Sequence, residues 1–421
     1  MSLPTVSPFA NSLTTETAFD VLAVAKRLKA SGKDVIELQI GDSPFPSSSS
    51  ALEAGKRAID AGATRYCPSL GLPEFRETIA AKVKKEFGIP ATADHIVVGP
   101  GAKVFETYFC EAFLEPGDEV LLFSPQFPTY EPNIARRGGV PVYANLTLAN
   151  AFRPDPADVE KFIKTSKRPK AIFLNSPHNP TGGVATKGDL EAIANLVRGK
   201  NIAILSDEPY CHMLWPDENG APRKHHSILA EPGMMDQCMG AYTFSKSYSM
   251  SGWRCGFLVA HPTLAQMIGK MINTSLSCVP PIVQHAGQAA LEHDDAERDA
   301  TMAKFHKKVE LLVNELKTVA NLKVLMPAGT FYVFPHVQPI CDSLGITSHG
   351  LAMYLLEGAD DKKGVACLGG ECFGQAGKGF LRFSCAEPDD KLVRAVAFLK
   401  EAITRTDRVK AYLEKNPKYK A

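Results

Sequence analysis

Residues 239–260 read MGAYTFSKSYSMSGWRCGFLVA, with a polar loop between two short apolar runs. The runs, Met239–Phe244 and Cys255–Ala260, have the length and the residue types of buried strands. Lys246 follows the first run closely and has serines on both sides. An amine held at the end of a buried strand is partly desolvated, which makes it a better nucleophile and Schiff-base former than a solvated lysine. Taken alone, the Ser-Lys pair is also compatible with an ordinary surface lysine.

Apolar runs of the same kind recur upstream and alternate with helical segments. The runs are His95–Val98, Glu119–Phe123, Val140–Ala144, Lys170–Leu174 and Ile202–Leu205. Helical spacing is clear between most of them, as in Ala102–Leu114 and Asp189–Arg198. Strands that are apolar on both faces and alternate with helices predict an α/β fold, in which a mostly parallel sheet has helices on both faces.

The two ends of the chain differ from this alternating region. Ala18–Lys33 has the pattern of an amphipathic helix, a long charged helix begins near Asp294, and a last helix begins at Asp389. Short strands are expected at Lys323–Met326, Phe331–Phe334, Val365–Leu368 and Phe380–Ser384. We therefore expect a smaller α+β domain formed by both termini. The predicted division is 1–55 for its N-terminal part, 56–293 for the large domain and 294–421 for its C-terminal part.

The composition argues against several classes of protein. The 421 residues include 47 basic and 46 acidic side chains, so a net charge of +1 gives no reason to expect nucleic acid as a partner. No apolar run is long enough to span a bilayer, and the first residues lack the pattern of a signal peptide. The ten cysteines include no C-x-x-C pair, which favours reduced thiols in the cytoplasm. We expect no metal site and no membrane partner.

Polar residues follow the predicted strands at the edge where ligands bind in such sheets. Gly99–Lys103 (GPGAK) leads into a helix, and small residues there let backbone N–H groups reach a phosphate, although a plain turn is the simpler reading. Asn179 follows another strand within an Asn-Pro-Thr-Gly turn, which is a turn signal in its own right. Asp207 comes directly after a buried run, where a helix cap, a salt bridge or a cationic ring nitrogen would satisfy it.

The lysine loop itself carries groups that suit a phosphate. Thr243 and Ser245 offer hydroxyls, and Arg254 can bind an anion through two N–H groups. The order of these motifs along the chain is more specific than any one of them. A glycine loop, N-P-T-G, D-x-x-Y and S-K with an arginine eight residues later all fall at successive strand ends.

In this order of motifs the sequence resembles the class I/II aminotransferases, a group of fold-type-I pyridoxal-phosphate enzymes. The resemblance covers nearly the whole chain. It includes Leu38-Gln-Ile-Gly41-Asp-Ser-Pro, Tyr66-x4-Gly71-x4-Arg76, Pro327-Ala-Gly-Thr-Phe-Tyr and Leu381-Arg382-Phe-Ser. It implies a transferase of amino acid metabolism that uses pyridoxal 5′-phosphate.

The resemblance assigns roles to residues around the cofactor ring. Lys246 matches the lysine that forms the Schiff base with the cofactor and moves a proton between the substrate Cα and the cofactor. Asp207 matches the partner of the pyridine nitrogen. Asn179 and Tyr210 match residues that bond the phenolic oxygen. Phe127 stands where an aromatic side chain stacks on the ring and where tyrosine or tryptophan is common.

Further roles concern the phosphate, the substrate and a second subunit. The phosphate ligands implied are Gly101, Ala102, Lys103, Thr243, Ser245 and Arg254, with Thr243 in place of a frequent serine. Tyr66 matches a tyrosine that reaches the phosphate of the partner subunit, so a homodimer with shared active sites is implied. Arg382 matches the arginine that binds the substrate α-carboxylate, together with Asn179 and the backbone of Gly41. The loop that carries Gly41 is a loose version of the family pattern.

The resemblance predicts transfer of an amino group between an L-amino acid and a 2-oxo acid. A carbon–sulfur β-lyase or an aminocyclopropane-carboxylate synthase would carry nearly the same residues. Some transcription regulators join this fold to a DNA-binding domain, but only about forty residues precede Gly41, which is short for such a domain.

The donor is expected to be a neutral or aromatic amino acid. Glu111, about two turns along the helix after the glycine loop, would repel an acidic substrate if it faced the pocket. It could equally face water or a neighbouring lysine. An apolar pocket could be lined by Phe127, Tyr130, Phe331, Tyr332 and Phe373.

Overall fold

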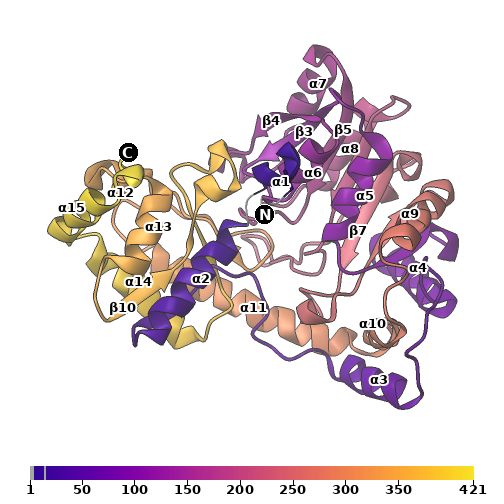
Figure 1. Cartoon of the computed structure of the whole chain (residues 1–421), viewed down its shortest axis with the longest axis horizontal. Coiled ribbons are helices and arrows are strands. Elements are labelled where there is room, and N and C mark those ends of the chain that lie inside the picture. Colours follow the sequence, from indigo (N-terminus) through magenta and orange to yellow (C-terminus); the bar gives the residue numbers. More distant parts are fainter. Residues whose placement is uncertain (1–3, 14–15) are drawn as a thin grey trace.

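A seven-stranded sheet forms the centre of the computed structural model, which describes residues 4–13 and 16–421 (Figure 1). In spatial order its strands are β2 (Ile96–Gly99), β8 (Gly256–Ala260), β7 (Cys238–Thr243), β6 (Ala203–Asp207), β5 (Pro169–Asn175), β3 (Glu119–Ser124) and β4 (Val140–Asn145). Strand β8 is antiparallel to both of its neighbours, and every other pair is parallel. The predicted α/β fold with a mostly parallel sheet is confirmed.

Helices cover both faces of this sheet, because successive strand residues point to opposite sides. On one face, Val97 and Leu122 pack with side chains of α5 (Lys103–Phe113), α6 (Tyr130–Arg136) and α9 (Pro262–Ser275). On the other face, Val98 and Leu121 belong to the core that contains side chains of α4 (Pro73–Phe87), α7 (Pro156–Thr165), α8 (Lys187–Val197) and α10 (Pro281–His293). Two buried faces explain why the strands read as continuous apolar runs.

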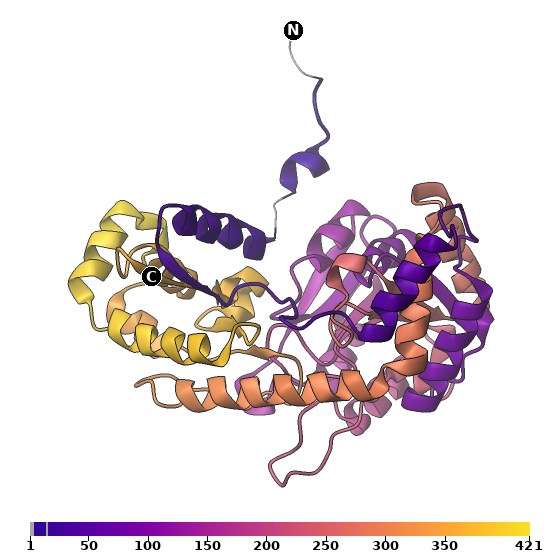
Figure 2. The same ribbon diagram turned by 90° about the horizontal axis from the view of Figure 1, so that it is seen from below.

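A separate apolar core combines residues 21–38 with the C-terminal elements, and in Figures 1 and 2 the indigo helix α2 lies beside these yellow and orange elements. Its helices are α2 (Thr17–Ala30), α11 (Asp295–Leu316), α12 (Gln338–Leu344), α13 (Ser348–Glu357), α14 (Asp389–Ala402) and α15 (Thr406–Lys415). Its strands are β1 (Asp34–Glu37) parallel to β10 (Lys363–Ala366), and β12 (Leu381–Ser384) between β11 (Leu368–Gly369) and β9 (Tyr332–Val333).

Long helix α11 extends from the large core into this second core, as Figure 2 shows. Its first turns lie next to α10, and its later residues Phe305, Val309 and Leu312 are buried among the C-terminal elements. Of the remaining helices, α3 (Ser49–Asp60) packs against α10, and α1 (Pro8–Ser12) precedes α2. The domain boundaries after residues 55 and 293 stay a prediction.

Two expectations for the C-terminal region are wrong. Residues 323–326 form no strand, and Lys323 makes only an isolated bridge to His336. Leu325 and Met326 are exposed and Pro327, which has no N–H, follows them, so this segment cannot extend a ladder. The helix that begins at Asp389 is not the last, since α15 follows it. In the described residues no helix is long and apolar enough to cross a membrane.

Candidate active site

A cavity of about 480 Å³ is lined by the last residues of β5, β6 and β7, namely Asn175, Asp207 and Thr243. The register of the parallel strands aligns these ends, because Asn175 pairs with Asp207 and Asp207 with Ala241. Asn175 also donates its side-chain amide to the Asp207 carbonyl at 2.7 Å. Polar residues that are far apart in sequence therefore meet at one edge of the sheet.

All but two of the site residues predicted from the sequence line this cavity. Those that do are Gly41, Ala102, Lys103, Phe127, Asn179, Asp207, Tyr210, Thr243, Ser245, Lys246, Arg254 and Arg382. Gly101 lies just behind the lining, and a Cβ on it would stand 2.7 Å from the Arg254 guanidinium. Tyr66 does not line the cavity, and the residue is 88% exposed to solvent.

Lys246 projects into the cavity from the loop after β7. Its ammonium donates to the Gly41 carbonyl at 2.6 Å and lies 5.9 Å from the ring centre of Tyr210. Only glycine fits at position 41, because a Cβ there would overlap the Tyr332 hydroxyl at 1.7 Å. The loop that carries Gly41 thus comes close to both Lys246 and Tyr332.

The groups proposed for a phosphate gather on one side of the lysine. The hydroxyls of Thr243 and Ser245 are 2.8 Å apart. Arg254 donates to the carbonyls of Pro100 at 2.8 Å and Ser251 at 3.0 Å, which holds it against the glycine turn. Gly101 adopts φ +88°, a conformation that favours glycine, and lets the turn approach Arg254. Together these donors form an anion-binding concavity.

Asp207 presents a buried carboxylate to the cavity. Its Oδ2 accepts a hydrogen bond from the Tyr130 hydroxyl at 2.6 Å. Burial raises the pKa of Asp207 to about 6, although the bond from Tyr130 opposes this rise. A cationic ligand group next to Asp207 would favour its charged form.

Arg382 is the clearest sign of an anionic ligand. It is 4% exposed, and its N–H groups reach the Asn179 amide oxygen at 3.0 Å and the Gln39 carbonyl at 2.6 Å. The guanidinium lies 4.3 Å from the Tyr332 ring centre and 4.9 Å from that of Phe373. Within the described residues no acid pairs with it, and its Nε has no hydrogen-bond partner. A buried guanidinium without a counter-ion is costly, so this position suits a carboxylate.

Sequence reasoning missed two acids that line the cavity besides Asp207. Glu106 lies one turn after Lys103 on α5 and accepts from the Thr129 hydroxyl at 2.6 Å. Burial, followed by the negative charge of Asp207, raises the pKa of Glu106 well above its usual range. Glu16 forms an ion pair with Lys103 at the cavity wall. The spacing of three from Lys103 could have revealed Glu106, whereas no local signal connects Glu16 to Lys103.

Glu111 does not line the cavity, so the prediction that it repels acidic substrates is wrong. It forms an ion pair with Arg136 at 3.8 Å, so its partner is an arginine rather than the lysine or water of the alternative. Eight residues separate it from Lys103, which places it about 12 Å further along the helix axis. Of the aromatic residues expected in the pocket, Phe127 and Tyr332 line it, Tyr130 bonds Asp207, and Phe373 packs on Arg382.

Comparisons with known proteins agree with this arrangement. The family described as Aminotransferase class I and II matches residues 33–398. An aspartate aminotransferase of Pyrococcus horikoshii is 33% identical over 88% of this chain and 91% of its own length. Aromatic-amino-acid aminotransferase 2 of Thermococcus litoralis is 32% identical over 86% of this chain and 90% of its own. The solved aspartate aminotransferase of Thermus thermophilus with maleate superposes with a TM-score of 0.87 at 29% identity, covering 95% of this chain and 100% of that one.

The chain belongs to the class I and II aminotransferase family. It is a pyridoxal-phosphate-dependent aminotransferase of fold type I, which confirms the predicted family, enzyme class and cofactor. The relatives named here are aminotransferases, which favours amino transfer over the β-lyase alternative.

The residues around the cavity fit pyridoxal 5′-phosphate. The concavity of Gly101, Thr243, Ser245 and Arg254 suits its phosphate, and the buried carboxylate of Asp207 suits a cationic ring nitrogen. The guanidinium of Arg382, which has no acidic partner in the described part of the chain, suits a substrate carboxylate. The roles of the individual residues stay predictions.

Replacement of Tyr130 by phenylalanine tests the environment of Asp207. Tyr130 donates to the charged form, so its loss raises the pKa of Asp207 further, and the acid limb of the kcat/KM profile moves to higher pH. We expect kcat/KM at pH 6 to fall about tenfold, with a smaller loss at pH 8. The control is Tyr143→Phe, which removes a hydroxyl bonded to Glu131 outside the cavity. A profile unchanged by Tyr130→Phe would contradict this role.

Proposed function

We propose that this aminotransferase moves an amino group between an L-amino acid and a 2-oxo acid, and that its preferred donor is neutral or aromatic. The observation that carries the proposal is the buried guanidinium of Arg382 without an acidic partner among the described residues, across the cavity from Lys246. An α-amino acid has the carboxylate that Arg382 would bind through two hydrogen bonds.

In this proposal each side chain orients the substrate or moves a proton. Arg382, with Asn179, binds the α-carboxylate and directs the Cα–H bond of the substrate toward the Lys246 amine. The free amine of Lys246 then takes the proton from Cα and would pass it to the cofactor. Pyridoxal phosphate, when bound, supplies the conjugated ring that accepts the electron pair left by this proton. Asp207 keeps a proton on the ring nitrogen, and Tyr210 and Asn179 bond the phenolic oxygen.

The preference for a neutral or aromatic donor rests on what surrounds the substrate side. Phe19, Phe127 and Tyr332 contribute aromatic surface to the cavity wall. The ammonium of Lys103 is already paired with the carboxylate of Glu16 and lies 5.2 Å from the Phe127 ring centre. Because Glu16 neutralises Lys103, this part of the pocket favours an uncharged substrate side chain. The similarity to an aromatic-amino-acid aminotransferase supports the same choice.

An acidic donor is the second candidate, and Lys103 is the observation that favours it. If Glu16 moved away, the ammonium of Lys103 would face the cavity and could bind a distal carboxylate. The relative from Pyrococcus horikoshii is an aspartate aminotransferase. Glu16 therefore decides between the two candidates.

The enzyme is further proposed to act as a homodimer in the cytoplasm. Tyr66 supports the dimer, because it is exposed and lies outside the cavity of its own chain. From this position it could reach the phosphate site of a second subunit. The ten cysteines are all free thiols, which supports a reducing compartment.

Lys246→Ala should abolish turnover, because no other amine would stand between Cα and the cofactor. Borohydride reduction of the wild-type holoenzyme, followed by peptide mapping, should find the cofactor on Lys246. The matched control Lys56→Ala removes a lysine of an exposed ion pair on α3 and should leave activity intact. Cofactor attached to a different lysine would end the assignment.

The donor preference is tested by kcat/KM for phenylalanine, methionine, alanine and aspartate. The wild type should use phenylalanine best, and Glu16→Gln should raise kcat/KM for aspartate relative to phenylalanine by about tenfold, since it frees the ammonium of Lys103. Glu53→Gln, which breaks an exposed ion pair on α3, is the control. A wild type that strongly prefers aspartate would establish the acidic-donor candidate instead.

The dimer is tested by mixing inactive subunits. Lys246→Ala and Tyr66→Phe subunits should form heterodimers in which one of the two sites has both residues intact. We expect activity to rise on mixing toward about one quarter of the wild-type value, because half of the sites in half of the dimers are restored. Heterodimers that form without any gain in activity would mean that Tyr66 serves its own subunit.

A further inference from the structure

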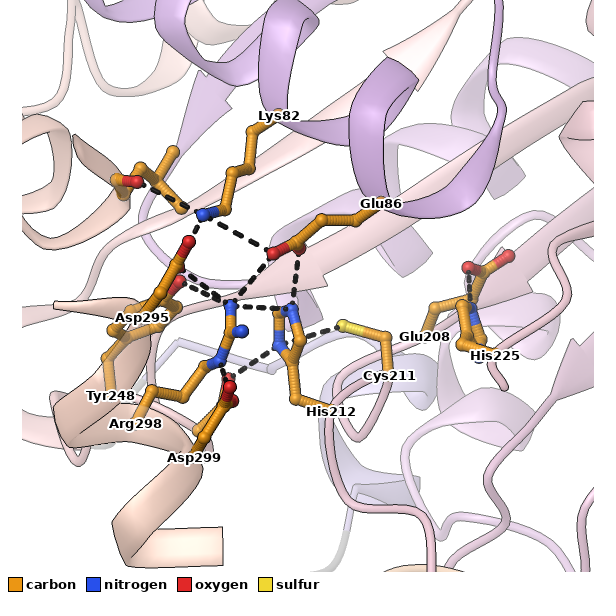
Figure 3. A network of polar contacts seen from close by, with 12 residues as sticks. Lys82, Glu86, Glu208, Cys211, His212, His225, Tyr248, Asp295, Arg298 and Asp299 are labelled. Atoms are coloured by element: carbon orange, nitrogen blue, oxygen red, sulfur yellow. Dashed lines mark hydrogen bonds and ion pairs between the residues drawn. The ribbon is translucent and has the colours of Figure 1, made fainter. Parts of the chain in front are cut away.

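A cluster of buried charged side chains lies next to the lysine loop, outside the cavity (Figure 3). Glu86 of α4 is its centre. Its carboxylate lies 2.9 Å from His212 Nε2, 3.1 Å from Arg298 of α11 and 3.3 Å from Lys82. Burial alone would raise the pKa of Glu86, but His212, Arg298 and Lys82 lower it to about 2, so the carboxylate is charged.

His212 connects two loops that meet at the cavity. It follows Tyr210 by two residues, in the loop after β6. Its Nδ1 lies 3.2 Å from the hydroxyl of Ser247, the residue directly after Lys246. Arg298 in turn donates to the Tyr248 hydroxyl at 3.2 Å. The two residues after Lys246, Ser247 and Tyr248, are therefore both held by hydrogen bonds from this cluster.

The hydrogen-bond partners determine which nitrogen of His212 carries the proton. Burial lowers the pKa of His212, so the ring is neutral and one nitrogen is an acceptor. Two groups lie close to Nε2: the charged carboxylate of Glu86 at 2.9 Å, which can only accept, and Nη1 of Arg298 at 3.2 Å, which can only donate. The shorter contact, to Glu86, places the proton on Nε2, and Arg298 then donates to Glu86 rather than to the ring. Nδ1 is then the acceptor, and the Ser247 hydroxyl donates to it. Glu86 thus orients the ring so that its free nitrogen faces the lysine loop.

From this chain of contacts we propose that His212, oriented by Glu86, is a positioning residue for Lys246. It holds the Ser247 hydroxyl and so sets the direction in which the neighbouring lysine enters the cavity. The inference rests on the role proposed above for Lys246. It goes beyond that role, because it assigns to a residue outside the cavity the task of keeping the amine aligned with the ring-binding loop of Asp207 and Tyr210.

The same cluster links this alignment to the second core. Arg298 stands near the start of α11, whose later residues Phe305 and Val309 are buried among the C-terminal elements. Arg298 contacts Glu86, Tyr248 and the ion-pair partners Asp295 and Asp299. Helix α11, which continues into the C-terminal core, is therefore hydrogen-bonded through Arg298 to Tyr248 in the loop of Lys246.

Two substitutions of His212 separate its two contacts. Gln places an amide where Nε2 stands and keeps the link to Glu86, whereas Asn places an amide where Nδ1 stands and keeps the link to Ser247. We expect His212→Gln and Ser247→Ala each to lower kcat about tenfold with KM changed less than about twofold, the effect of one lost buried hydrogen bond on alignment. His212→Asn should recover most of kcat.

A spectroscopic measurement distinguishes alignment from mere stability. The absorbance of the cofactor bound to its lysine changes with pH, and its midpoint should shift in His212→Gln and Ser247→Ala by similar amounts. The double variant should be no worse than either single one, because both remove the same contact. Thermal midpoints of the cofactor-free proteins are measured alongside. Asp299→Asn, which alters only the exposed rim of the cluster, is the control and should leave the absorbance midpoint unchanged.

Three results would overturn the inference. They are an absorbance midpoint and kcat unchanged in His212→Gln while the thermal midpoint falls, additive effects in the double variant, or His212→Asn as impaired as His212→Gln. Borohydride mapping keeps this test separate from the proposed function. A wild-type adduct on another lysine refutes the role of Lys246, whereas adducts on Lys246 in every variant with unchanged midpoints refute only the role of His212.

Discussion

The buried carboxylate of Asp207 is the constraint on which the site depends. A charge at the end of an apolar strand needs donors close by, and Tyr130 supplies one at 2.6 Å from the other side of the sheet edge. The adjacent residue Glu208 is satisfied more fully, by hydroxyls of Ser206, Ser227 and Tyr242 and by His225. Of these two neighbouring acids only Asp207 lines the cavity, where a cationic group of a ligand could neutralise it. This electrostatic environment suits a cofactor with a cationic nitrogen.

The site lies where two apolar cores meet. Asp207 and Lys246 come from the central sheet, whereas Arg382 is on β12 among the C-terminal elements and Gly41 is in the loop that follows β1. Contacts between the two sets are short and polar: Arg382 binds Asn179, and Lys246 binds the Gly41 carbonyl. In the proposed mechanism, substrate orientation and proton transfer therefore belong to different parts of the fold. Any change in how the cores pack would alter the distance between carboxylate binding and the amine.

The sequence predicted the sheet well because its signal is local. Strands such as β3 have an unbroken apolar run, here Val120–Phe123, and this pattern can be recognised without knowledge of the neighbouring strands. The strand predicted for residues 323–326 does not form. A short apolar segment becomes a strand only if a partner strand is available, and Leu325 and Met326 are exposed instead. Glu16, which also lines the cavity, was missed for a related reason. Glu16 and Lys103 are 87 residues apart, and nothing local marks them as a pair.

By itself, then, the sequence determined which residues stand at strand ends, since alternating apolar runs and turn motifs place Asn179, Asp207 and Lys246 directly after buried strands. The order of these motifs was also enough to indicate the family and its cofactor. Only the tertiary structure decided which charges lie free and which are neutralised. Among the described residues Arg382 has no acidic partner, whereas Lys103 is paired with Glu16, and Glu111 faces Arg136 rather than the cavity. The physical reason is that electrostatic energy depends on distances and burial, which packing sets between segments far apart in the chain.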